Sequence, residues 1–187
     1  MRLRGDTLRK LATKAGVSTE QLAQAVERPG MAGDDAVSAV NNWIEGKDHP
    51  RCKAPDIRKL AAAVGAQPKD IARFVSQVLA HRGSPRKAKL LVDLVRGKSV
   101  DDALNLLTFT TKRAAVNVKK ALNAAIADAE QAEADVTTLF VSESRVDDGG
   151  MLKRFQPKDR GRAHPIEKRF SHITIGVQER VAKGVGA

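Results

Sequence analysis

The chain has 187 residues, 42% of them apolar, which is enough to fill at least one hydrophobic core and excludes disorder throughout. Its 33 Lys and Arg residues outnumber 22 Asp and Glu residues, and the net charge of +11 predicts a polyanionic partner, nucleic acid first. A merely soluble basic protein stays open as the alternative. A single cysteine, Cys52, excludes an internal disulfide bond and a multi-thiolate zinc site.

No apolar stretch approaches the roughly 20 residues of a membrane span, and the N-terminus lacks the apolar core of a secretory signal. We therefore expect a cytoplasmic protein with no membrane partner.

From 6 to about 74 we expect four or five short helices and no strand, because apolar residues recur at helical spacing between Gly, Pro and Asp interruptions. Ser18 and Gln21 have the spacing of a capping pair at the start of the second helix. Gly65 is expected to end the fourth helix in a left-handed conformation, and Pro68 to open a fifth.

An extended stretch around 77–82 is followed by a helix with Ser84 as its N-cap and Pro85 at its first position. Leu90 and Leu94 widen the apolar face of this helix, so we expect it to be largely buried.

Two more helices follow. Ser99 and Asp102 have capping-box spacing and start a short one. The other is expected from near Thr111 to about Glu130, with small apolar residues on one face. These residues are Ala115, Val118, Leu122, Ala125 and Ala129.

Strand patterns appear at 139–146 and 173–177, and the two strands are expected to pair. The polar segment between them, about 147–170, is too long for a hairpin turn, and Gly161 offers a reversal point. At about 3.3 Å per extended residue the segment could carry its tip roughly 50 Å from the body, so we expect a long protruding arm. Residues 182–187 are expected to form a mobile tail.

Charge is concentrated on this arm. Between 153 and 169 it has two acidic residues, Asp159 and Glu167, against seven basic ones. The basic residues are Lys153, Arg154, Lys158, Arg160, Arg162, Lys168 and Arg169. A two-stranded ribbon with these repulsions is marginal alone, and the phosphates of a folded RNA would neutralise it. The alternative is a disordered, solvated basic loop.

A second cationic cluster surrounds the start of the helix at Ser84, whose exposed amides also favour phosphate. Its members are Arg82, Arg86, Lys87 and Lys89. The alternative interpretation is an ordinary solvated face.

The sequence SPRK at 84–87, followed by LVDLVRGKSV at 91–100, resembles the opening of the L-twenty-two family of bacterial large-subunit ribosomal proteins. The segments LKRFQP at 152–157, RGRA at 160–163 and KRFSHIT at 168–174 resemble the extended hairpin and returning strand of the same family. The resemblance covers about 77–177. It implies an α+β body of three helices on a small antiparallel sheet with a long protruding β-hairpin.

The resemblance also implies a ribosome-bound structural protein that binds large-subunit ribosomal RNA beside neighbouring ribosomal proteins and supports assembly. Its hairpin would line the peptide exit tunnel and meet the nascent peptide. Leu152, Lys153 and Arg154 would lie near the tunnel constriction and the macrolide site, with Arg160, Gly161 and Arg162 at the far tip. The RNA-binding set is then Arg82, Ser84, Arg86, Lys87, Lys89, Lys153, Arg154, Lys158, Arg160, Arg162, Lys168, Arg169 and His172.

The extension before this region resembles a repressor-type helix-turn-helix domain at 8–12, 18–26, 40–47 and 60–65. Residues 27–36 stand where such domains have a tight turn. We expect an added module for ribosomal RNA or a neighbouring protein. A sequence-specific DNA-binding regulator, acting through this extension, is the alternative function.

No pattern indicates catalysis, because the four histidines are scattered and no Gly-rich phosphate loop occurs. We expect a non-enzymatic protein without cofactor or metal. The expected organisation is a small all-α, helix-turn-helix-like extension at 1–75 and an RNA-binding domain at 76–187, with the arm at about 147–170.

Overall fold

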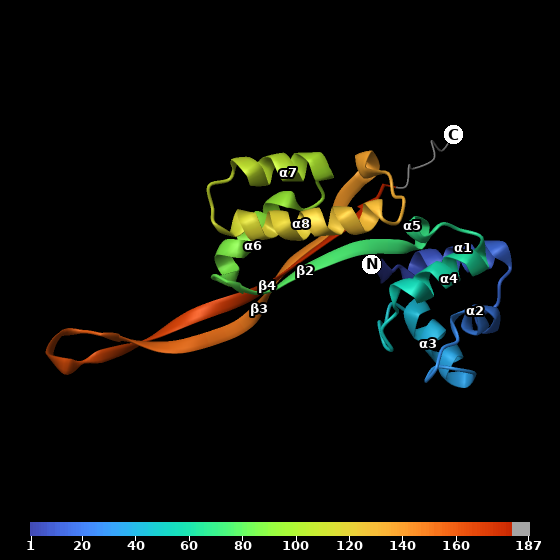
Figure 1. Ribbon diagram of the computed structural model, residues 1–187, viewed down its shortest axis with the longest axis horizontal. Coiled ribbons are helices and arrows are strands. Elements are labelled where there is room, and N and C mark those ends of the chain that lie inside the picture. The colour runs from blue at the N-terminus through green and yellow to red at the C-terminus, as the bar shows by residue number, and fades with distance from the viewer. Residues whose placement is uncertain (181–187) are drawn as a thin grey trace. The chain divides into compact units, whose positions relative to one another are not determined.

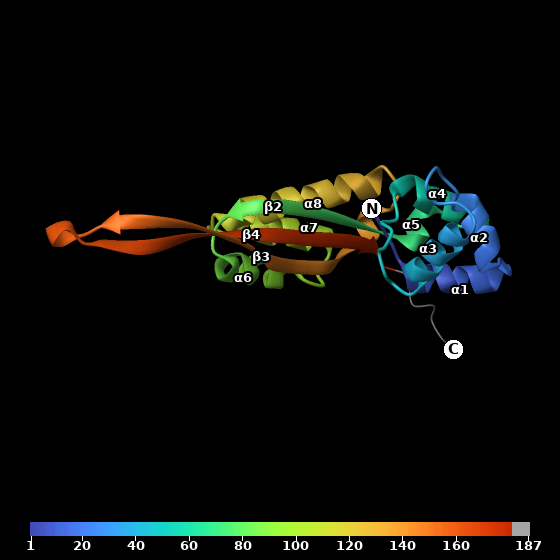
Figure 2. The same ribbon diagram turned by 90° about the horizontal axis from the view of Figure 1, so that it is seen from below.

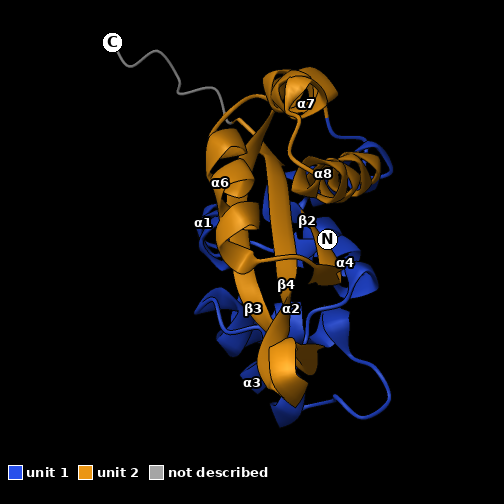
Figure 3. Ribbon diagram, turned by 90° about the vertical axis from the view of Figure 1, so that its left-hand side faces the viewer, with its two compact units in different colours: residues 1–74, 128–134 blue, residues 75–127, 135–187 orange. Residues whose placement is uncertain are grey.

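The computed structural model describes residues 1–180, so the tail expected at 182–187 lies outside the described residues. Two compact units are present: unit 1 comprises Met1–Phe74 and Asp128–Ala134, and unit 2 comprises Val75–Ala127 and Asp135–Ala187 (Figure 3). Within residues 1–180, no helix combines the length and the apolar character needed to cross a membrane. The functional division at 75/76 stays a prediction.

Unit 1 is built mainly from short helices. They are α1 (Gly5–Ala15), α2 (Thr19–Val26), α3 (Asp34–Ile44), α4 (Ala54–Val64) and α5 (Pro68–Ile71). The predicted start of α2 is confirmed, because the Ser18 hydroxyl accepts from the Gln21 amide and the Gln21 side chain accepts from the Ser18 amide. Gly65 ends α4 with a φ of 69°, as expected. Fully buried apolar side chains such as Leu8, Leu22 and Leu60 form the core.

The expectation of no strand in this region is wrong at its end. Strand β2 (Ala72–Arg82) begins directly after α5, and its first residues pair with the short strand β1 (Arg2–Leu3). The apolar residues Ile71, Ala72 and Phe74 fit a helix turn as well as a strand, so local periodicity could not separate the two. The deciding partner, β1, lies about 70 residues away in the sequence.

One buried ion pair joins the loop after α2 to the start of α4. The Arg28 guanidinium lies 2.6 Å from the Asp56 carboxylate, which also accepts from the Lys53 amide at 3.0 Å. Asp56 is buried but fully engaged, so the cost of removing its charge from water is offset. Burial, together with the charges of Asp56 and Asp48, raises the pKa of the Cys52 thiol to about 12, which makes it an inert core group.

Unit 2 has a mixed α+β fold, as expected. Its helices are α6 (Pro85–Val95), α7 (Val100–Phe109) and α8 (Ala114–Glu130), and its longest strands are β3 (Leu139–Pro157) and β4 (Ala163–Glu179). Strand β4 lies between β2 and β3, and β3 and β4 are antiparallel. The helices cover one face of this sheet, as Figure 1 and Figure 2 show. The core therefore lies between that face and the helices.

The buried face of α6 is narrower than expected. Leu91 and Val92 are buried, but Leu90 is 58% exposed and Leu94 is 39% exposed, so the prediction of a largely buried helix is wrong on that flank. Ser84 occupies the N-cap position of α6, but its hydroxyl makes no capping hydrogen bond. The long helix begins at Ala114, three residues later than expected.

A hydrogen-bond network fixes α6 against β3. The Ser144 hydroxyl, in β3, donates to the Val92 carbonyl at 3.0 Å and accepts from the Arg96 side chain at 3.0 Å. Arg96 also donates to the Ser144 carbonyl at 2.6 Å. Ser144 is 4% exposed, so these bonds satisfy a polar group that would otherwise be buried without partners.

Candidate nucleic-acid interface

The distal halves of β3 and β4 form the expected arm, which extends beyond the helices of unit 2 (Figure 2). The antiparallel register continues from Met151 opposite Arg169 to Pro157 opposite Ala163. The side chains of 151–169 are exposed, except that of Ile166, whose exposure is intermediate. Backbone pairing alone therefore holds this part of the hairpin together, and nearly all its side chains face outward.

A β-bulge marks the base of the arm. The register shifts between Asp148 and Met151, where Gly150 has a φ of 88° and donates its amide to the Asp148 carboxylate at 3.3 Å. A Cβ on Gly149 would lie 3.1 Å from Nε2 of His172. Two consecutive glycines thus permit the backbone to turn past the ring of His172 before the arm begins.

His172, expected among the RNA-binding residues, lies at this base and not on the distal arm. Its Nδ1 accepts a hydrogen bond from the amide of Ala80, in β2, at 3.0 Å. The ring is partly buried. One ring nitrogen is therefore occupied by a bond that ties β4 to β2, and only Nε2 remains for another partner.

The chain reverses where Gly161 was expected to allow it. A single 3₁₀ turn, η2 (Asp159–Gly161), connects the strands, and the Lys158 amide donates to the Arg162 carbonyl at 2.7 Å. Gly161 has a φ of 71°, and its neighbour Arg160 also has a positive φ, of 54°. A non-glycine residue rarely adopts this left-handed region, and the side chain of Arg160 is exposed at the tip.

The cations of the arm are mostly free of acidic partners. Across the described residues, Arg169 pairs with Glu167 at 3.3 Å, while the other arm cations form no ion pair. In the ladder Lys153 stands opposite Glu167, Leu152 opposite Lys168, and Arg154 opposite Ile166. Positive charge is consequently presented on both faces of the ribbon.

Exposed apolar side chains interrupt these charges, a feature that sequence patterning did not indicate. Phe155 is 76% exposed, and Met151 and Leu152 are 44% and 40% exposed. A strand pattern predicts that alternate residues are buried, but no third strand or helix from residues 1–180 covers either face. The arm thus offers apolar contact surface as well as charge.

The residues expected to line a tunnel fall into two places on the arm. Leu152, Lys153 and Arg154 lie in the paired region, opposite 166–168. Gly161 and Arg162 lie at the turn and just after it. The structure therefore separates them into a mid-arm group and a tip group.

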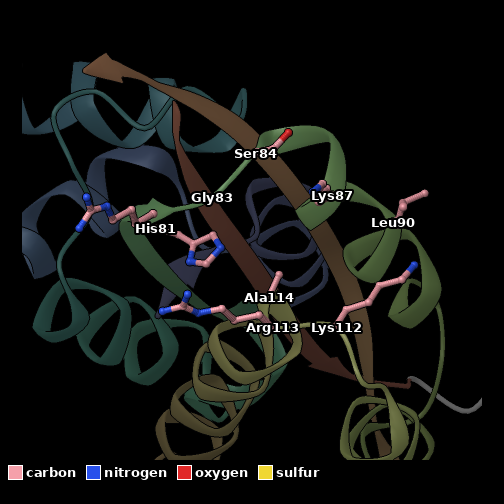
Figure 4. Close-up of a pocket in the computed structure, with 9 residues that line it drawn as sticks. His81, Gly83, Ser84, Lys87, Leu90, Lys112, Arg113 and Ala114 are labelled. Atoms are coloured by element: carbon pink, nitrogen blue, oxygen red, sulfur yellow. The ribbon is translucent and has the colours of Figure 1, made fainter. Parts of the chain in front are cut away.

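The second expected cluster surrounds a cavity of about 590 Å³ at the start of α6 (Figure 4). Arg82, Ser84 and Lys87 line it, whereas Arg86 and Lys89 are exposed on α6 and do not. Lys112 and Arg113, from the turn before α8, add two more cations to the lining. Sequence analysis missed these two cations, because only the tertiary fold brings the turn at 112 beside the helix start at 84.

His81 forms part of the same wall. Its Nδ1 lies 2.6 Å from the side-chain amide nitrogen of Asn117, in α8, which fixes Nδ1 as the acceptor. Burial, and secondarily the charge of Arg113, lowers the pKa of His81. The neutral imidazole is therefore favoured over the charged form.

Fold and surface together define the class: a basic α+β protein that carries a long cationic hairpin. Residues 76–178 match the family Ribosomal protein L22p/L17e, and the chain belongs to that family. Large ribosomal subunit protein uL22 of Desulfitobacterium hafniense (strain DSM 10664 / DCB-2) is 50% identical over 115 residues, which are 61% of this chain and 96% of the relative. Family membership makes this chain a cytoplasmic, ribosome-bound protein. Residues 1–75 lie outside the family match.

Proposed function

We propose that this chain is a structural constituent of the large ribosomal subunit. It binds large-subunit ribosomal RNA, supports subunit assembly, and extends its arm along the peptide exit tunnel. Family membership and the name of the relative, a large ribosomal subunit protein, support this assignment.

The observation that carries the proposal is the arm. Seven cations stand on a ribbon whose distal side chains are almost all exposed, and two acidic residues oppose them. Folding gains little from such a segment, since it buries almost no apolar surface. Phosphates supply the missing partners, and the release of their counterions gives an affinity that falls steeply with salt. The arm is therefore built for an external polyanion.

The mid-arm group and the tip group of tunnel residues have different roles. Leu152, with Lys153 and Arg154 beside it, presents an apolar and cationic surface to the tunnel interior and to the nascent peptide. Gly161 and Arg162 place a narrow, charged tip deeper in the RNA. Arg160, expected at the same tip, is exposed there and adds to its charge.

For the extension, contact with ribosomal RNA or a neighbouring ribosomal protein is favoured over DNA reading. In a helix-turn-helix domain the first residues of the second helix contact base edges. Here the corresponding helix, α3, begins with the exposed acids Asp34 and Asp35. Two carboxylates at that position repel DNA phosphates, and α2 and α3 are separated by seven residues, 27–33, instead of a tight turn.

A sucrose gradient of a low-magnesium lysate tests the function. The full chain should sediment with large subunits and move to light fractions only when the salt concentration is raised far enough to screen phosphate contacts. A chain that stays in the light fractions at low salt would contradict the ribosomal assignment and favour a free-standing regulator. Treatment of the lysate with ribonuclease provides the control, because it should release the protein.

A further inference from the structure

The cavity at the start of α6 combines charge with apolar walls. Arg82, Lys87, Lys112 and Arg113 line it, and no acidic side chain among residues 1–180 does so. None of these four cations has an ion-pair partner within the same described part of the chain. The site therefore has uncompensated positive charge and is suited to an anion.

The remaining walls suit a flat, partly apolar group. Leu90 and Ala114 contribute apolar surface, and the stems of the lysines add more. In Figure 4 the ring of His81 lies on the same side as the start of α8, together with Arg113 and Ala114. A Cβ on Gly83 would come within 2.7 Å of Nε2 of His81, so the glycine allows the chain to pass close to the imidazole.

Polar groups other than the four cations also line the cavity. The hydroxyl of Ser84 makes no capping bond to α6, so it remains available as a donor. The imidazole of His81 offers a stacking face, and its Nδ1 lies against the side chain of Asn117. Arg guanidinium and His rings are the groups on which unpaired RNA bases stack.

We propose that this cavity binds a single unstacked nucleotide of the ribosomal RNA. The phosphates on its two sides contact Lys112 and Arg113, whose side chains extend in opposite directions in Figure 4, and its base packs between His81 and the apolar wall at Leu90 and Ala114. This inference rests on the proposed function, since it specifies how the same RNA is held at a second place, away from the arm.

The shape of the cavity favours a splayed nucleotide over other anions. Its volume, about 590 Å³, lies within the range of about 300–1,000 Å³ that is typical of small-molecule sites. A duplex backbone needs a shallow cationic surface and would leave the apolar walls unused. An acidic peptide would satisfy the cations but not the stacking face of His81.

The test uses the full chain and transcribed large-subunit ribosomal RNA, probed with dimethyl sulfate and a 2′-hydroxyl acylating reagent. The wild-type protein should protect one unpaired nucleotide in addition to the nucleotides covered by the arm. Ala114→Phe fills the cavity without changing charge. It should expose that nucleotide again and weaken binding about five- to 150-fold, the effect of losing one stacked base. The salt slope, which is the slope of log affinity against log salt concentration, should stay unchanged.

The double variant Lys112→Gln/Arg113→Gln should also lose this protection, and its salt slope should fall by about 1.4, or about 0.7 for each of two contacts to single-stranded RNA. Lys98→Gln/Lys120→Gln removes the same charge from exposed positions outside the cavity and should keep the nucleotide protected. If Ala114→Phe fails to fold, Leu90→Ser, at a 58% exposed position, replaces it and should give the same loss of protection.

Two failures are distinguishable. If the wild-type protein binds no large-subunit RNA, the proposed function fails. If it binds and protects the arm's nucleotides, but the cavity variants leave every reactivity unchanged, the nucleotide site is overturned and the proposed function stands. A different result would assign the cavity to an acidic peptide: the wild-type protein binds a fluorescent polyglutamate probe, the cavity variants lose that binding, and the RNA reactivities stay unchanged.

Discussion

The arm and the segment 1–75 are both basic, but they use charge in opposite ways. Residues 1–75 include 13 basic and nine acidic residues, and their Arg28–Asp56 pair is buried inside the fold. On the arm, seven cations face two acids, and nearly all of the distal side chains are exposed. Net charge alone would not distinguish the two regions.

The difference lies in what each region gains by folding. Unit 1 buries a core of Leu, Ile, Val and Trp side chains, so its structure is supported internally. The arm has only its backbone ladder, and its side chains remain available to a partner. Substitutions should therefore affect stability in unit 1 and in the body of unit 2, and affect RNA affinity on the arm.

The largest expected effect on stability is the difference between truncating a buried apolar side chain and truncating an exposed one. Leu60 is fully buried in unit 1, so Leu60→Ala should lower the free energy of unfolding by about 2–5 kcal/mol. Phe155, a larger side chain on the arm, is 76% exposed, and Phe155→Ala should change stability by no more than about 0.5 kcal/mol. Urea unfolding of both variants measures the contrast, and equal losses would break it.

The body of unit 2 should depend on its buried polar network. Ser144→Ala removes the hydroxyl that bridges the Val92 carbonyl and the Arg96 guanidinium, and should reduce stability by about 1–3 kcal/mol. Ser142→Ala, in the same strand, removes one long bond of 3.3 Å to the Gly176 carbonyl and should have a smaller effect. Thermal unfolding compares the two, and a larger loss for Ser142→Ala would contradict the account.

At the base of the arm, Gly150→Ala places a side chain at a φ of 88°, a conformation that costs an L-residue about 1–2 kcal/mol. Because the distal ladder supports nothing else, local opening of the arm should release this strain. We expect faster amide hydrogen exchange in 151–169 with little change in the melting temperature. A lower melting temperature with unchanged exchange on the arm would show that arm and body unfold together.

The smallest expected effect is the pH dependence contributed by His81. Its folded-state pKa is lowered by burial and by Arg113, so the unfolded chain, with a His pKa of about 6.5, takes up the proton first as pH falls. The contribution to stability is present above that pH and is lost as pH falls through the folded-state pKa. Melting temperatures between pH 8 and pH 5 should fall less for His81→Gln than for the wild type. Parallel curves would count against this assignment.

Features specified within a few residues were predictable from sequence. The Ser18–Gln21 capping pair, the left-handed Gly65 and the reversal at Gly161 each depend on local backbone chemistry, and the structure confirms them. The arm was predictable for a similar reason, because strand alternation flanks a polar basic segment too long for a turn.

Features that depend on tertiary neighbours were not predictable. Leu90 has the spacing of a buried residue, but the sheet covers only the opposite flank of α6. The start of β2 is defined by its pairing with β1, and Lys112 and Arg113 reach the cavity only because the fold brings the turn before α8 to the start of α6. The local periodicity of a single sequence does not indicate contacts between residues that are far apart in the chain.

The most direct test of the account is the salt dependence of binding to large-subunit ribosomal RNA. One variant replaces Lys153, Arg154, Lys158, Arg160 and Arg162 with Gln, and a matched control replaces the exposed Arg9, Lys10, Lys14, Arg58 and Lys59 of unit 1. At about 0.7–0.9 per phosphate contact, the arm variant should lose about 3.5–4.5 from the slope of log affinity against log salt, with unchanged thermal stability. The control should lose less than half as much. Equal losses, or an arm variant that binds like the wild type, would contradict the claim that the arm is the principal RNA-binding element.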